Sequence, residues 1–245
     1  LTSWDWRLNR EGEPTVTQPH SGLWFGFGVQ FAGGFLQGDA DDIRLRPELR
    51  AYAPVTEDIT VAIRWAAGLL FPRNYGDSLL PGSEADETVR ARDLQLMSFR
   101  AFFSGGPSSN RGYGYRGVGP HEVLPFLSQY GQSRDRLPAG GRGLWELSAE
   151  LRIPLSELTT GVVFVDASDV VKQTSDFRAT HPHISPGLGF RYLTPVGLLR
   201  LDAGYRVPYL QRLGERYLEP EEGGPMEGES ESFPLGVHLA IGDAY

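Results

Sequence analysis

Residues 187–205 read GLGFRYLTPVGLLRLDAGY, and this stretch decides the fold. Apolar and polar side chains alternate on both sides of a short turn at Thr194-Pro195-Val196. One parity carries Leu188, Phe190, Tyr192, Leu199, Leu201 and Tyr205. The other parity carries Gly187, Gly189, Arg191, Arg200 and Asp202. Alternation with a period of two predicts two antiparallel strands that have one apolar face and one polar face.

The same alternation extends outward from this hairpin over most of the chain. It occurs in residues 1–10, 22–34, 43–54, 58–71, 144–153, 159–167 and 233–245. About nine strands result, and most are longer than the five or six residues typical of soluble strands. Roughly ten residues is the length that a tilted strand needs to cross a bilayer. The strand lengths therefore favour a membrane barrel.

The connections and the charges point to the same class. Short turns around residues 54–56, 155–157 and 194–196 alternate with longer segments after residues 34, 71, 169 and 209. Short turns on one side and long loops on the other are typical of outer-membrane barrels. A soluble barrel would have to bury large rings from nearly every strand in one core. We therefore predict an all-β, antiparallel transmembrane barrel with rings facing lipid and charges facing a wet lumen.

The composition of the chain excludes several classes of function. The chain of 245 residues carries a formal net charge of -8, which argues against a nucleic-acid-binding protein. It contains no cysteine, so a disulfide framework and a thiolate metal site are excluded. The 31 glycines and 18 prolines suit many strands joined by turns. No apolar run has the length of a membrane helix.

Regular alternation stops over residues 72–141, which we interpret as one long loop. Within it, residues 105–120 read GGPSSNRGYGYRGVGP, too rich in glycine for a helix or a regular strand. A loop of this length in a β domain is normally functional or disordered. Arg111 lies at the centre of this stretch, which raises the question of which group it pairs with. The candidates are Glu150 and Asp166, which lie on the charged parity of two successive strands.

These blocks together resemble a known family. The order is the NRGY loop, a strand ending in AELRIPL, the strand GVVFVDAS, the hairpin quoted above and an aromatic-ended last strand. It resembles the C-terminal barrel of the outer-membrane protein assembly superfamily, which includes BamA, TamA and the two-partner secretion transporters. The family pattern has an aliphatic residue where Asn110 stands and a glycine where Ser168 stands, so the chain departs from it at two positions.

The resemblance implies a site and an architecture. In the family the loop is extracellular, folds into the lumen, and its arginine contacts acids on the next two strands. Carried over, the loop-to-barrel lock comprises Arg111, Gly112, Tyr113, Glu150 and Asp166. The family barrel has sixteen strands after periplasmic repeat domains. We therefore expect residues 1–245 to be its last nine strands, as a fragment or as a chain that pairs with another, without the repeats.

The resemblance also assigns a role to the last strand. In the family, an aromatic-ended strand is the signal that directs insertion into the membrane. The corresponding residues are Val237, Leu239, Ile241 and Tyr245, all of one parity. We expect Tyr245 to share the lipid-facing side with the other three.

The remaining candidate residues do not indicate a metal site or a catalytic site. His181 and His183 are two histidines without a third ligand, and the acidic run at Asp39, Asp41 and Asp42 lacks the later glutamate of a calcium loop. We expect these and the acidic segment 215–231 to be solvated loops, with no metal and no cofactor. No nucleophile elbow, phosphate-binding loop or zinc-protease helix occurs, so we expect no enzyme activity.

The function hypothesis is a bacterial outer-membrane barrel that inserts or translocates other proteins. Its expected partners are outer-membrane lipids, unfolded outer-membrane or secreted client proteins, other chains of an assembly complex, and no nucleic acid. The alternatives are a two-partner-type secretion transporter, a passive pore or structural barrel, and a soluble β-barrel binding module. The clients are not predictable from the sequence.

Overall fold

The computed structural model describes residues 2–36, 38–80, 82–122, 137–180, 182–195, 197–208 and 234–244. Nine of the strands described form one antiparallel sheet, in which consecutive strands pair along the chain. The strands are β1 (Thr2–Asp5), β2 (Gly22–Ala32), β3 (Asp42–Pro54), β4 (Thr60–Pro72), β7 (Gly143–Pro154), β8 (Thr159–Val171), β9 (His183–Thr194), β10 (Gly197–Tyr205) and β11 (Leu235–Ile241). The predicted antiparallel sheet of about nine strands is confirmed.

The sheet is apolar on its outer face and charged on its inner face. Exposed outer side chains include Phe27, Phe31, Trp65, Val163, Leu188, Phe190, Leu201, Val237, Leu239 and Ile241. Buried inner side chains include Glu48, Arg64, Glu146, Glu150, Arg152, Asp166, Arg191, Arg200 and Asp202. This distribution is the reverse of that in a soluble protein, in which charged residues are almost never fully buried. It is the arrangement of a barrel wall between lipid and a polar interior, as predicted.

The hairpin that decided the fold has the expected register. Arg200 on β10 lies opposite Arg191 on β9, and Leu201 lies opposite Phe190. Cross-strand partners share a face, so each face stays uniform across the hairpin. Because a slip of one residue would exchange the two faces, this pattern fixes the register.

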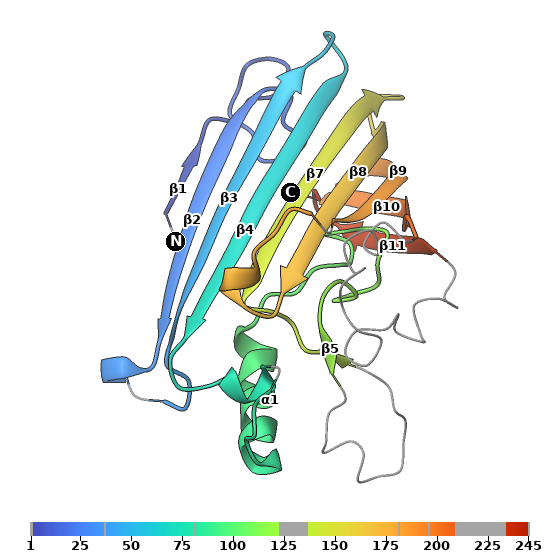
Figure 1. Cartoon of the computed structure of the whole chain (residues 1–245). Helices are drawn as coiled ribbons and strands as arrows, with labels where there is room; N and C mark the ends of the chain where they lie inside the picture. The colour runs from blue at the N-terminus through green and yellow to red at the C-terminus, as the bar shows by residue number, and fades with distance from the viewer. Residues whose placement is uncertain are drawn as a thin grey trace.

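The connections at the two ends of the sheet differ in length. Residues 6–21, 55–59, 155–158 and 195–196 join strands at one end, and all of these except 6–21 are short turns. Residues 33–41, 73–142, 172–182 and 206–234 join them at the other end. Figure 1 shows the sheet curving between β8 and β11, with α1 beyond the ends of the strands on the long-loop side.

The connection between β4 and β7 contains structure that the sequence interpretation missed. It holds η2 (Asp77–Leu79), α1 (Glu87–Arg100), β5 (His121–Glu122) and β6 (Leu137–Pro138), while η1 (Gly34–Leu36) and η3 (Thr174–Asp176) lie in other loops. Asp86 caps α1 by accepting hydrogen bonds from the backbone N–H groups of Thr88 and Val89. Among the described residues, none of the helices has the length and hydropathy needed to cross a membrane.

Both ends of the predicted strand pattern were too long. The strand expected over residues 1–10 ends at Asp5, because Leu8 forms isolated bridges with Pro14 and Ser21 instead. The strand expected over residues 233–245 runs from Leu235 to Ile241. After it, Gly242 has a φ of +98°, a left-handed conformation that favours glycine and ends the strand.

Candidate functional site

The candidate site forms where the long connection returns to the inner face of the sheet. After α1 the chain is held by bridges from Phe102 to Gly141 and from Ser104 to Val118. These bridges make a narrow loop, residues 105–117, whose tip lies on the wall formed by β7 to β11. In Figure 1 this green segment lies on the concave side of the sheet. We call residues 110–113 the loop tip.

Arg111 is the centre of the loop tip. Its side chain is only 1% exposed, although it is an arginine in a loop. Nε and Nη2 donate to the two carboxylate oxygens of Asp166 on β8, each over 2.8 Å. Nη1 donates to Glu150 on β7 over 2.5 Å. The planar guanidinium therefore grips one carboxylate with two parallel bonds and a second carboxylate with its remaining nitrogen.

Further wall residues surround the same guanidinium. The Ser148 hydroxyl accepts from Nη2 over 3.2 Å and donates to Asp166 over 2.5 Å. The Phe164 ring lies beneath the guanidinium, with Cζ 3.5 Å from the ring centroid. The backbone N–H of Arg111 also donates to Asp166, over 3.0 Å. Main chain and side chain of the same residue thus share one carboxylate.

The neighbours of Arg111 are also fixed to the wall. The Asn110 amide donates to the Ser168 hydroxyl over 2.9 Å and to the His183 carbonyl over 2.7 Å, and its oxygen accepts from Ser185. The Gly112 N–H donates to the Ser185 hydroxyl over 3.1 Å. A Cβ at Gly112 would lie 2.3 Å from the Cβ of Ser185, so the close approach requires glycine.

Tyr113, the last residue of the loop tip, is 2% exposed. Its ring packs edge-on against His183, with centroids 5.5 Å apart. Of the sequence-predicted residues, the structure thus brings Arg111, Gly112, Tyr113, Glu150 and Asp166 to one place. Asn110, Ser148, Phe164 and Ser185 are site residues that the sequence interpretation did not assign.

A second set of contacts, which we call an anchor, ties the loop to the sheet one residue before the loop tip. The Ser109 hydroxyl donates to Glu146 on β7. Glu146 in turn accepts from Nη1 of Arg64 on β4 over 2.8 Å, and Nε of Arg64 donates to Glu48 on β3 over 2.9 Å. The parity of these strands indicated that their charges face inwards, but nothing in the sequence matched Ser109 to Glu146.

The long-loop end of the sheet carries a third anchor. Asp42 was expected in a solvated acidic loop, which is wrong: it is the first residue of β3 and 1% exposed. It accepts from Arg100 at the end of α1 and from the Tyr75 hydroxyl. Burial and the hydrogen bond to Asp42 raise the pKa of Tyr75. The helix is therefore tied to the sheet by a buried ion pair.

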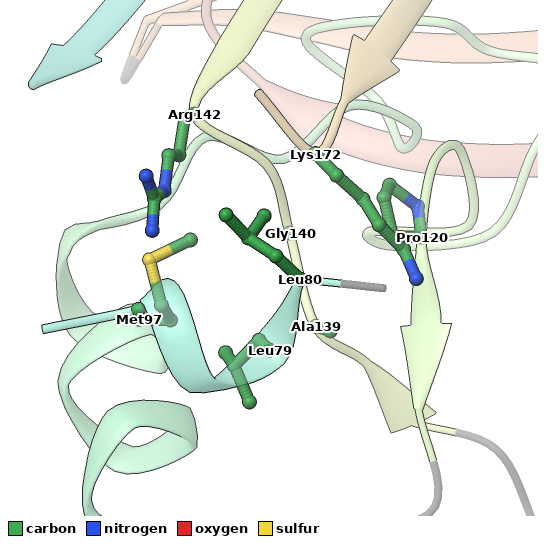
Figure 2. Close-up of a pocket in the computed structure, with 9 residues that line it drawn as sticks. Leu79, Leu80, Met97, Pro120, Ala139, Gly140, Arg142 and Lys172 are labelled. Carbon is green, nitrogen blue, oxygen red and sulfur yellow. The ribbon is translucent and has the colours of Figure 1, made fainter. Parts of the chain in front are cut away.

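A shallow pocket opens beside this anchor. Figure 2 shows it between η2, α1 and residues 139–142, which lead from β6 into β7, and it is lined by Leu79, Met97, Pro120, Gly140, Arg142 and Lys172. Its lining holds no acid and no histidine, so no acid–base or metal chemistry is assigned to it. Across the part of the chain that the structure describes, no cluster of three His, Asp or Glu side chains could hold a metal ion.

The remaining predicted residues lie on or beyond the last strand. Val237, Leu239 and Ile241 point to the outer face and are 61%, 70% and 75% exposed. Tyr245, His181 and the acidic segment 215–231 lie outside the described residues. His183 is the first residue of β9, not a loop residue as expected, because β9 extends to pair with Ser168.

Two comparisons place this geometry among known proteins. Residues 6–211 match the family model of the Omp85 superfamily domain. The fold is similar to that in the crystal structure of BamA from Haemophilus ducreyi lacking POTRA domains 1-3, with a TM-score of 0.57 and 17% sequence identity. The match covers 78% of this chain and 36% of that chain. The present chain thus spans about a third of the protein that it matches, and the likeness concerns the fold.

Proposed function

We propose that this chain, which belongs to the Omp85 superfamily and whose sheet is part of a bacterial outer-membrane barrel, inserts or translocates other β-rich proteins. The proposal assigns it no chemical reaction. Its working parts would be the barrel wall and a loop that can occupy or leave the inner face. The partners would be outer-membrane lipids and unfolded client proteins.

The burial of Arg111 between two carboxylates carries this proposal. A loop that served only as a surface connection would not need an arginine 1% exposed with both Asp166 and Glu150 in direct contact. Removing one partner of a buried ion pair typically costs about 3–5 kcal/mol, because the other charge stays buried without compensation. The loop tip would therefore hold one defined position and leave it only as a unit.

An assembly barrel is favoured over a passive pore by how the inner face is occupied. Residues 109–113 all bond to the wall or pack on it, and they bridge strands from β7 to β9. A plug that is held so specifically suits a protein whose interior changes during a cycle. The two-partner-type secretion transporter has the same kind of barrel, and it stays the alternative because the described residues include no client-binding domain.

The experiment uses the full-length protein reconstituted in liposomes. Folding of a client barrel protein would be followed by its heat-modifiable mobility with wild type, Arg111→Ala and a control, Arg116→Ala. Arg116 belongs to the same loop but stacks on Phe103, 4.0 Å from the ring centroid, and within the described residues it forms no ion pair with a wall carboxylate. We expect Arg111→Ala to abolish client folding and Arg116→Ala to keep most of it.

Two other outcomes would decide against the proposal. Open conductance in planar bilayers without any effect of either variant on client folding would favour the passive pore. Client release across the membrane, rather than insertion into it, would favour the secretion transporter.

A further inference from the structure

The last strand contacts the loop tip directly. His238 on β11 lies on the inner face, and its ring Nε2 is 3.1 Å from the backbone carbonyl oxygen of Arg111. Because a carbonyl oxygen only accepts, this nitrogen carries the proton and donates it. The hydrogen bond uses the main chain of Arg111, so it involves a different group from the guanidinium that pairs with the carboxylates.

Two glycines make this contact possible. Gly204 on β10 and Gly236 on β11 are cross-strand partners. A Cβ at Gly204 would lie 2.7 Å from the carbonyl carbon of Arg111, and one at Gly236 would lie 2.6 Å from its oxygen. Any side chain at either position would push the loop tip away. The β10–β11 hairpin therefore has a gap in its inner surface where the loop backbone lies.

The segment after β11 reaches the same site by a second route. Beyond Gly242, the carboxylate of Asp243 accepts from both terminal nitrogens of Arg152 on β7, over 3.1 and 3.3 Å. Arg152 also donates to Glu150 over 3.0 Å, and Glu150 accepts from Arg111. We call residues 242–244 the tail. Ion pairs thus connect the tail, through Arg152 and Glu150, to the loop tip.

The tail is also packed, not only paired. Ala244 is 7% exposed and forms a small apolar cluster with Tyr52 on β3 and Ala62 on β4. In the sheet order these strands are far from β11, so the tail crosses the inner face. In Figure 1 the C label lies between β4 and β7 and not beside β1 or β11. The tail therefore holds Asp243 beside Arg152.

We propose that His238 and Asp243 are positioning residues of the loop lock, and that release of the loop tip and loosening of β11 are one coupled event. His238 holds the main chain of Arg111, and Asp243 acts through Arg152 on Glu150. Loss of the Arg111 side chain would weaken β11, and loss of either positioning residue would loosen the loop. The coupling itself follows from these contacts, and only its use during client handling rests on the proposed function.

The first test measures how well the base of the loop is protected from a thiol reagent. Val118 is 2% exposed at the base of the loop, so Val118→Cys gives one buried thiol in a chain that otherwise has none. Its modification rate would be measured in the full-length protein in detergent, without a client. We expect His238→Ala and Asp243→Ala each to raise the rate about fivefold, the change that matches loss of one net hydrogen bond.

Conservative variants separate positioning from general weakening. His238→Gln keeps an N–H donor and should restore most of the protection, and Asp243→Glu should do so in part. Val237→Ala is the matched control, because it shortens a neighbouring side chain on the lipid-facing side of the same strand. We expect it to leave the thiol rate unchanged. Heat-modifiable mobility of every variant would show that the barrel is folded.

The second test measures the local stability of β11. Hydrogen exchange of β11 amides would be compared between wild type and Arg111→Ala, with β3 as the internal reference. Faster exchange in β11 and unchanged exchange in β3 is the expected result. Equal exchange in β11, or thiol rates unaffected by His238→Ala and Asp243→Ala, would overturn the inference. Coupling without any client effect would instead reject the proposed function alone.

Discussion

The side-chain amide of Asn110 donates a 2.9 Å hydrogen bond to the hydroxyl of Ser168, joining the loop tip to β8. At both positions the resemblance noted in the sequence implies another residue, an aliphatic one in the loop and a glycine in the strand. An aliphatic side chain could not donate, and a glycine could not accept. Each departure supplies the group that the other needs, so the two substitutions form a matched pair.

The first prediction is that Asn110 and Ser168 are energetically coupled. Asn110→Val and Ser168→Gly should each destabilise the loop, since each removes the buried hydrogen bond between these two side chains. The double variant should lose less than the sum, by about 1 kcal/mol, because it removes both groups. A double-mutant cycle on the protection of Val118→Cys measures this term. Strict additivity would show that the two positions act independently.

The second prediction concerns the charge and the shape of Arg111. Arg111→Ala should release the loop with the barrel still folded, because Asp166 and Glu150 would then face each other without their shared cation. Arg111→Lys should rescue only in part, since an ammonium cannot match two carboxylates in one plane. Limited proteolysis of the loop in intact vesicles measures the release. A loop as protected in Arg111→Ala as in wild type would contradict the prediction.

The alternation of side chains predicted the sheet because it is a local signal. Arg200 and Leu201 are consecutive residues of β10. Successive side chains of a pleated strand point to opposite faces, whatever the rest of the chain does. The same parity placed Glu150 and Asp166 on the charged face. Their contact with Arg111 followed from the family resemblance, because periodicity cannot tell where a loop returns.

Three features could not be predicted because they depend on distant packing. Helix α1 has a cap at Asp86, but it lies in a segment whose composition suggests an irregular loop. Burial of Asp42 depends on Arg100, which is far along the chain. The inner position of His238 follows from its parity, yet its partner is a backbone carbonyl of the loop and leaves no trace in the sequence.

The third prediction tests the gap in the terminal hairpin. Gly236→Ala should displace the loop tip, because its methyl group would lie 2.6 Å from the carbonyl oxygen of Arg111. Gly114→Ala is the matched control, since a Cβ there meets nothing within 4 Å. Thiol modification of Val118→Cys should rise severalfold in the first variant and stay unchanged in the second. Equal rates would mean that the hairpin can adjust without moving the loop.

The fourth prediction concerns orientation in the membrane. We expect the long connections to face the outside of the cell and the short turns to face the periplasm. Glu87 in α1 and Glu157 in a short turn are both exposed, and the chain has no cysteine of its own. An impermeant maleimide should label Glu87→Cys in intact cells and Glu157→Cys only after the outer membrane is opened. The reverse pattern would invert the topology.

The fifth prediction is that the outer face of β11 contacts lipid. Leu239 is 70% exposed on that face, and a lysine at the bilayer midplane of a barrel costs about 2–4 kcal/mol, less near the interfaces. Ala240, the next residue, faces the polar inner side, where Arg200 is its cross-strand partner. Leu239→Lys should therefore lower the urea midpoint for unfolding from lipid vesicles, while Ala240→Ser should change it little. If the two substitutions cost the same, the last strand would not lie in the membrane with the parity that the sheet gives it, and its proposed role as an insertion signal would lose its physical basis.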